Sequence, residues 1–173
     1  MTAYVALLRG VNLVGKTSLK MADLKAIAGT LKLEKARTYI ASGNLLFLSD
    51  RGEEELRQAL EKELQAHMGK GVRVMLRTAD EMAAVATANP FADRSGNRVQ
   101  AFFMNERPPH NLVETVRSQA EDEQVAAGAR EVFVAYGERG IGRSRLRIPA
   151  AEAGTARNMN TVAKLAELAR EMS

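Results

Sequence analysis

Cysteine and tryptophan are both absent from this chain of 173 residues. Without thiols the protein has neither disulfides nor thiolate metal sites, which favours a reducing compartment. No apolar run approaches the roughly 20 residues that span a bilayer. The N-terminus also lacks a basic stretch followed by a long apolar core. We therefore expect a cytoplasmic protein with no signal peptide and no membrane partner.

Histidine is scarce, and His67 and His110 are the two present. Neither has a second ligand at the spacing that metal sites use, so the sequence predicts no metal site and no cofactor. A nucleophile would have to be Ser, Thr, Lys or a carboxylate, and no nucleophile–base pattern is recognisable. Ser42 lies in a short turn but lacks the G-x-S-x-G context. Enzymatic activity is left open, with the catalytic residues unknown.

Neither sign of charge is in large excess: 25 basic and 21 acidic residues give a net charge of +4. This balance is compatible with anion binding but is too mild to indicate a nucleic-acid-binding protein by itself. The basic residues gather late in the chain, at Arg139, Arg143, Arg145, Arg147 and Arg157. The segment from Arg139 to Arg147 is therefore an alternative site, for non-specific nucleic-acid binding.

Residues 10–17 match the P-loop pattern G-x-x-x-x-G-K-[ST]. They follow an apolar run at residues 4–8 that is typical of a buried strand. A P-loop protein needs a mostly parallel sheet and a helix that begins at the Lys-Thr pair, where its N-terminus meets the phosphates. The helical spacing of apolar residues begins here only at about Met21. We therefore disfavour a P-loop nucleoside triphosphatase.

The order of the remaining patterns predicts the fold of the first half. Strand-like runs occupy residues 4–8, 37–40, 45–48 and 72–76, and helical spacing covers residues 21–31 and 53–68. The gap at residues 41–44 is too short for a parallel crossover, so the second and third strands form an antiparallel hairpin. The resulting order, β-α-β-β-α-β, predicts a ferredoxin-like lobe over residues 1–77.

The second half repeats part of this order. Thr78 and Glu81 form a capping box that begins a helix, and Asn89-Pro90 ends that helix. A strand at residues 99–104, a helix carrying Leu112, Val113 and Val116, a strand at residues 131–136 and a last helix follow. Asn158, Asn160 and Thr161 are candidates for the cap of that helix. We predict an α+β protein whose second, modified ferredoxin-like lobe covers residues 78–173.

This topology predicts where polar loops meet. With right-handed crossovers, the connection after the first strand, the hairpin turn and the entry to the fourth strand lie at one edge of the sheet. The side chains gathered there are Arg9, Asn12, Lys16, Ser42 and Asn44, together with Lys70 and Arg73 near the entry to the fourth strand. Cations beside exposed glycine amides can form an anion site. Alternatively, the Asn and Ser side chains satisfy turn backbones and the cations are solvated.

A second candidate anion site lies at the start of the last helix, where Arg157 and Asn158 would meet an anion at the helix N-terminus. The alternative is a helix cap beside a surface arginine. Aromatic side chains for RNA stacking are few, and the RNP1 pattern is missing around Tyr39 and Phe47.

Several short motifs together resemble one bacterial family, known as domain of unknown function 1697. They are Leu8-Arg9-Gly10-Val11-Asn12 with Gly15-Lys16, Lys20-Met21-Ala22-Asp23-Leu24, Thr38-Tyr39-Ile40-Ala41-Ser42-Gly43-Asn44, Asn89-Pro90-Phe91 and Thr155-Ala156-Arg157-Asn158-Met159-Asn160-Thr161. The resemblance implies two ferredoxin-like lobes and supplies no activity. Two positions depart from the family pattern: Thr17 stands where Asn is usual, and Met159 stands where Trp is usual.

Three classes of function are compatible with these observations. The first is a binding module for a phosphorylated or carboxylated small molecule at the edge around Arg9 and Lys16. The second is non-specific nucleic-acid binding through the segment from Arg139 to Arg147. The third is a scaffold or regulatory plait without a ligand. Ligand identity and oligomeric state do not follow from the sequence.

Overall fold

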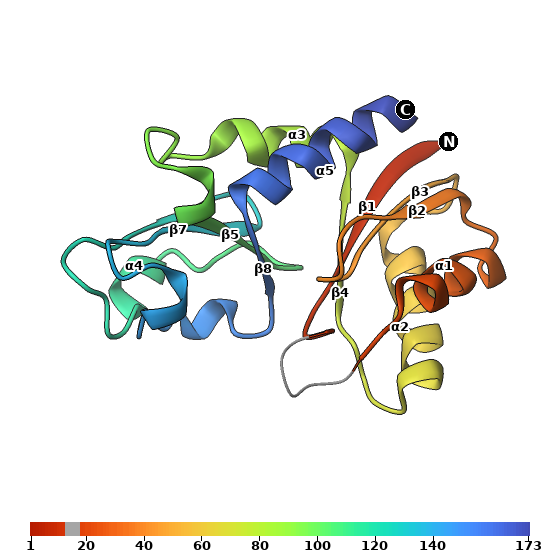
Figure 1. Ribbon diagram of the computed structural model, residues 1–173, viewed down its shortest axis with the longest axis horizontal. Helices are drawn as coiled ribbons and strands as arrows, with labels where there is room; N and C mark the ends of the chain where they lie inside the picture. The colour runs from red at the N-terminus through yellow and green to blue at the C-terminus, as the bar shows by residue number, and fades with distance from the viewer. Residues whose placement is uncertain (13–17) are drawn as a thin grey trace. The chain divides into compact units, whose positions relative to one another are not determined.

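The computed structural model describes residues 1–12 and 18–173, and within them it shows two four-stranded antiparallel sheets and five α-helices (Figure 1). The strands are β1 Thr2–Leu8, β2 Glu34–Thr38, β3 Asn44–Ser49, β4 Val74–Thr78, β5 Val99–Phe103, β6 Gln124–Ala127, β7 Glu131–Ala135 and β8 Thr155–Asn158. The helices are α1 Met21–Thr30, α2 Glu53–Met68, α3 Ala79–Ala88, α4 Leu112–Thr115 and α5 Met159–Met172. The protein is therefore of the α+β class, as predicted.

The chain divides into two compact units. The first unit contains Met1–Ala83 together with Leu165–Ser173, and the second contains Ala84–Lys164. The last part of α5 therefore belongs with the N-terminal residues. The boundary that the sequence predicts between residues 77 and 78 stays a prediction, and each unit is described by itself below.

The sheet of the first unit has the strand order β2-β3-β1-β4. Strand β1 is antiparallel to both of its neighbours, and Leu7 lies opposite Asn44 of β3 and Met75 of β4. Strands β2 and β3 are joined by the predicted antiparallel hairpin. This order is consistent with a ferredoxin-like unit. It also lacks the parallel strands that a P-loop fold requires, and α1 begins at Met21 rather than at the Lys-Thr pair.

Alternate residues of β1 face the helices of this unit, as the two-residue period of a strand requires. The buried cluster joins Tyr4, Ala6 and Leu8 to Leu24 of α1 and Leu60 of α2. Helices α1 and α2 cover the same face of this sheet (Figure 1). The rings of Tyr4 and Phe47 stack with centroids 5.7 Å apart inside this cluster. These two aromatics are therefore core residues and offer no platform for RNA bases.

The ends of two helices follow local sequence signals. Helix α2 carries Glu53, Glu54 and Glu55 in its first turn, where carboxylates stabilise the positive end of the helix dipole. It ends at Gly69, whose φ of 73° is the left-handed conformation that glycine commonly adopts at helix ends. At the start of α3 the amide of Glu81 donates to Thr78 Oγ1 and the amide of Thr78 donates to Glu81 Oε1. The capping box is confirmed.

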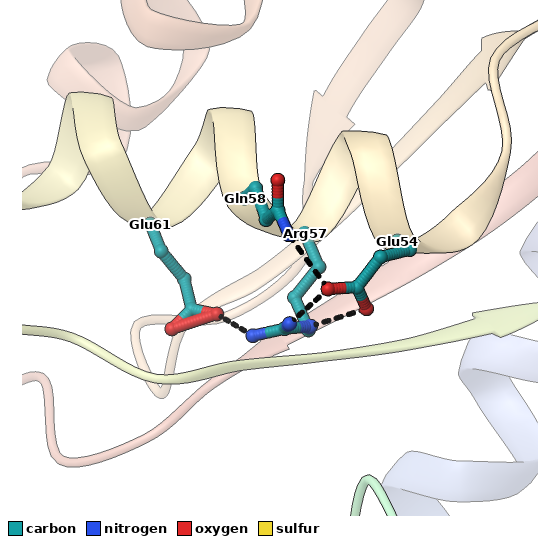
Figure 2. A network of polar contacts seen from close by, with 4 residues as sticks. All are labelled: Glu54, Arg57, Gln58 and Glu61. Carbon is teal, nitrogen blue, oxygen red and sulfur yellow. Dashed lines mark hydrogen bonds and ion pairs between the residues drawn. The ribbon is translucent and has the colours of Figure 1, made fainter.

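The solvent-facing side of α2 carries a small charged network centred on Arg57 (Figure 2). Its guanidinium donates to both carboxylate oxygens of Glu54 and, at 2.5 Å, to Glu61 Oε1. Gln58 Nε2 also donates to Glu54. The hydrogen bonds from Arg57, and then the one from Gln58, hold the pKa of Glu54 below its ordinary value. The partners are three and four residues apart, the spacing at which helix side chains meet.

The sheet of the second unit has the order β6-β7-β5-β8, again antiparallel throughout. Val132, Val134 and Tyr136 share one face, as predicted, and pack with Leu112 of α4 and Ile148. Strands β6 and β8 were not predicted from the sequence. Helix α4 has four residues and ends before Val116, which the sequence had placed in it. The arginine-rich segment after β7 contains 3-10 turns at Ile141–Arg143 and Pro149–Ala151.

We predict that Gly43→Ala lowers the free energy of unfolding by about 2–4 kcal/mol. Gly43 has a φ of 90°, and a Cβ there would lie 2.6 Å from Val11 Cγ2 and 3.0 Å from Leu8 Cβ. Gly29 lies in α1 with no atom within 4 Å of an added Cβ, so Gly29→Ala should stabilise the protein by about 0.5–1 kcal/mol. Urea denaturation of both variants measures the two changes in the free energy of unfolding. Equal changes in the two variants would contradict the packing around Gly43.

We also predict that Arg57→Gln lowers the melting temperature by a few degrees at neutral pH and has no effect at roughly pH 2–3. A carboxylate whose folded pKa is depressed stabilises the protein above its unfolded pKa, and that contribution is lost as pH falls through the folded pKa. Lys62→Gln, an exposed change on the same helix, is the control. Thermal unfolding at both pH values measures the difference, and a pH-independent effect of Arg57→Gln would refute it.

Candidate functional site

The loop after β1 is held in place by the side-chain amide of Asn12. Its Nδ2 donates to the carbonyls of Leu19 and Ala41, at 2.8 and 2.7 Å, and its Oδ1 accepts the amide of Leu19 at 2.7 Å. Gly10 and Asn12 both have a left-handed φ, 72° and 55°. Because both donors and the carbonyl oxygen are engaged, Asn12 acts here as a structural residue that closes the loop onto the β2–β3 hairpin.

The hairpin turn lies against the same loop. The amide of Leu8 donates to the Gly43 carbonyl, and Gly43 approaches Val11 too closely to carry a side chain. Asn44 is fully buried, and its Nδ2 donates to the Tyr39 carbonyl at 2.9 Å and to Ser42 Oγ at 3.1 Å. These bonds fix Ser42 and Asn44 in the turn. Asn12 and Asn44 therefore fit the alternative in which Asn and Ser side chains form hydrogen bonds with the backbone of turns.

The cations of this edge come from the residue after β1 and from the connection that leads into β4. The amide of Arg9 donates to the carbonyl of Arg73, so the end of β1 lies beside the residue that precedes β4. The side chains of Arg9, Lys70 and Arg73 are exposed. The structure thus brings Arg9, Asn12, Ser42 and Asn44 together at one edge, as the topology predicted. Lys16, the remaining predicted residue of this site, lies outside the described residues.

Arg157 and Asn158 lie in the second unit. Arg157 lies on β8 opposite Ala101 of β5, and its guanidinium is buried and donates to Thr155 Oγ1 at 2.7 Å and to the Ala156 carbonyl at 2.9 Å. Burial lowers the pKa of Arg157 to about 10, so the side chain is still charged at neutral pH. Asn158 Oδ1 accepts the amide of Thr161 at 2.9 Å and so caps α5. The helix N-terminus is capped, and the anion-binding role of this pair stays a prediction.

The arginine-rich segment borders a cavity of about 220 Å³ in the second unit. Arg139, Arg143 and Arg145 line it from one side, and Ser118, Gln119 and Asp122 line it from another. The sequence indicated the three arginines but not the segment opposite them, because residues 117–123 carry no motif of their own. We call this cavity the arginine hollow.

Among residues 1–12 and 18–173, no group of three or more His, Cys, Asp or Glu side chains is placed to hold a metal ion. His67 Nε2 lies 3.5 Å from Asp23 Oδ2, with both side chains partly exposed. No helix in the described part of the chain is long and apolar enough to cross a membrane.

Comparison with known proteins places the chain in a family. The family described as protein of unknown function DUF1697 matches residues 1–133. The chain belongs to this family. Because that match ends before β8, the segment 155–161 lies beyond it. No curated protein matches the sequence.

The chain is also similar to a solved structure, that of the conserved bacterial protein SP0830 from Streptococcus pneumoniae. The two share 24% sequence identity with a TM-score of 0.77, over 97% of this chain and 98% of the other. At this identity the likeness shows the fold alone. Its nearly complete coverage of both chains supports one α+β architecture across the two units.

We predict that Asn12→Ala lowers the free energy of unfolding by about 2–4 kcal/mol, because it removes all three amide hydrogen bonds and leaves a left-handed φ on alanine. Asn12→Gly removes the same bonds and tolerates the backbone conformation, so it should cost about 1 kcal/mol less.

Urea denaturation of both Asn12 variants separates the two contributions. Asn111 is exposed and has no side-chain cap bond, so Asn111→Ala should be neutral within about 0.5 kcal/mol. A parent-like stability for Asn12→Gly would show that the amide does not hold the loop.

Proposed function

We propose that this protein binds a phosphorylated or carboxylated small molecule at the edge of the first unit around Arg9 and Lys16. The observation that carries the proposal is the fixed geometry of residues 9–12, which the Asn12 amide ties to Leu19 and to the hairpin. The proposal takes the first unit as a ferredoxin-like plait, in which three connections share one edge.

The backbone of this edge is unusually constrained. Asn12, Ile40 and Gly43 all have a positive φ, of 55°, 50° and 90°. For a β-branched residue such as Ile40 this conformation is strained, and Ile40 is also 48% exposed. Strain of this kind persists where the surrounding structure over-determines it, and it gathers at ligand sites. A preformed backbone at these described residues reduces the entropy that a ligand must overcome on binding, which supports a recognition role.

The charges of the edge favour an anion. Arg9, Lys70 and Arg73 are exposed around the end of β1, and no carboxylate lies in the loop residues 9–12 or in the turn at 41–44. Lys16 adds a fourth cation by sequence. Because guanidinium groups bind carboxylates and phosphates through paired hydrogen bonds, Arg9 is the residue that we expect to contact the ligand first.

A thermal-shift screen over nucleotides, sugar phosphates and di- and tricarboxylates tests the proposal. A ligand at about 100 times its Kd should stabilise the folded protein by about 2.7 kcal/mol, which is a shift of several degrees. Arg9→Ala with Lys16→Ala should abolish this shift while the unliganded protein stays folded.

The matched control is Lys25→Ala with Lys62→Ala, two exposed lysines of α1 and α2 whose loss changes the net charge by the same amount. This control should keep the full shift. A full shift in the Arg9/Lys16 variant, or no hit in the screen, would reject the proposal and leave the scaffold alternative.

A further inference from the structure

The arginine hollow in the second unit is a partly open cavity of about 220 Å³. It is lined by three arginines whose side chains are exposed, Arg139, Arg143 and Arg145. Within the described part of the chain, none of these three side chains makes an ion pair or a hydrogen bond. Each of these side chains carries a positive charge that an anion in the hollow would neutralise.

The sequence of this segment explains why the arginines are exposed. Ile141 and Leu146 pack against the buried cluster of the second unit. Between these two anchors, Gly140 adopts a φ of 73° and a 3-10 turn covers Ile141–Arg143. Because the apolar side chains are fixed inward, the arginines that alternate with them are left exposed at the surface. The segment therefore presents its charges without a regular helix or strand.

Two sets of hydrogen bonds join the segment around residues 117–123 to the arginine-rich segment around residues 139–147. Arg117 and Arg147 exchange two backbone hydrogen bonds of 2.9 Å, which join the start of one wall to the end of the other. Ser144 Oγ donates to Glu123 Oε2 at 2.5 Å, and Glu123 Oε1 accepts the amide of Ala120 at 2.8 Å. Glu123 also lines the hollow, but it is 6% exposed and both of its carboxylate oxygens are engaged by these two bonds. A braced site needs little reorganisation to bind.

Asp122 also lines the hollow, and its side chain accepts a hydrogen bond from the backbone. Its Oδ2 accepts the amide of Glu138 at 3.0 Å. A Cβ on Gly137 would lie 1.9 Å from the same oxygen, so the Asp122 side chain can occupy this position only beside a glycine. The position of Asp122 at the border of the hollow leaves it able to accept a hydrogen bond from a hydroxyl group of a ligand.

The volume of the cavity and the residues that line it limit the class of ligand that it can bind. The cavity is smaller than the roughly 300–1,000 Å³ of ordinary small-molecule sites. A phosphate group carries about −1.5 to −2 charges at neutral pH and three acceptor oxygens, which suits several guanidinium donors. The described residues that line the hollow include no aromatic ring, so bases of a single-stranded nucleic acid would find no stacking partner.

We infer that the arginine hollow is a second, independent binding site, for a small phosphorylated molecule. The guanidinium groups of Arg139, Arg143 and Arg145 bind the phosphate, and Asp122 accepts a hydroxyl group of the same ligand. The site lies in the second unit and does not require the edge around Arg9.

Isothermal titration calorimetry with three probes tests this inference: inorganic phosphate, pyrophosphate and a pentose 5-phosphate. The titrations use the full chain carrying Arg9→Ala and Lys16→Ala, so that the first proposed site does not contribute. Adding Arg143→Gln and Arg145→Gln should weaken binding of the pentose phosphate by roughly tenfold or more, because two charge-assisted contacts are lost. Both positions are exposed, and the melting temperature of the unliganded variant verifies that it is folded.

The control adds Arg107→Gln and Arg170→Gln instead, two exposed arginines outside the hollow, and should keep the affinity. An unchanged affinity in the Arg143/Arg145 variant, or an equal loss in the control, overturns the inference. Binding of none of the three probes also overturns it. If a single-stranded oligonucleotide binds with a steep salt dependence while the small probes do not, the hollow belongs to a nucleic-acid surface and the inference is wrong.

Discussion

The polar edge of the first unit depends on one primary amide. The side chain of Asn12 joins the end of β1, the approach to α1 and the β2–β3 hairpin through three hydrogen bonds. A side chain with one acceptor and two donors is suited to this, since a carboxylate could not donate to the Leu19 and Ala41 carbonyls and a hydroxyl could donate only once. The positions of Arg9 and of the hairpin turn both follow from this closure, and Gly43 permits it by leaving room for Val11.

Much of the first unit could be predicted because its signals are local. The short turn at residues 41–44 requires an antiparallel hairpin, and the spacing of Leu56, Leu60 and Leu64 predicts helix α2, whose bounds are confirmed. Strands β6 and β8 were missed because each has four residues without a β-branched run; Thr155–Asn158 resembles the entry to a helix, which its last residue indeed caps. Helix α4 was predicted too long because Val116 continues the apolar spacing, although its ψ of 137° is extended.

In the candidate sites too, the sequence predicted what depends on topology and composition, and it missed what depends on tertiary contacts. The sequence grouped Arg9, Asn12, Ser42 and Asn44, and topology alone was enough to bring them together. It could not tell which of them are engaged by the backbone, since the partners of Asn12 lie seven and 29 residues away. Likewise, the arginine-rich segment is visible as composition, but the residues opposite it follow from the pairing of Arg117 with Arg147. Arg157 was expected at the surface and is buried, because β8 pairs with β5.

The first unit is not continuous in sequence, since it includes the last residues of the chain, Leu165–Ser173, as well as Met1–Ala83. Synthesis delivers the N-terminal strands and helices first, at about 5–20 residues per second. The first unit therefore lacks part of its final packing until the whole second unit has been synthesised. Completion of the first unit thus follows synthesis of the second. A chain interrupted before Leu165 lacks the part of α5 that belongs to the first unit, which makes the packing of the N-terminal half depend on residues that are synthesised after the second unit.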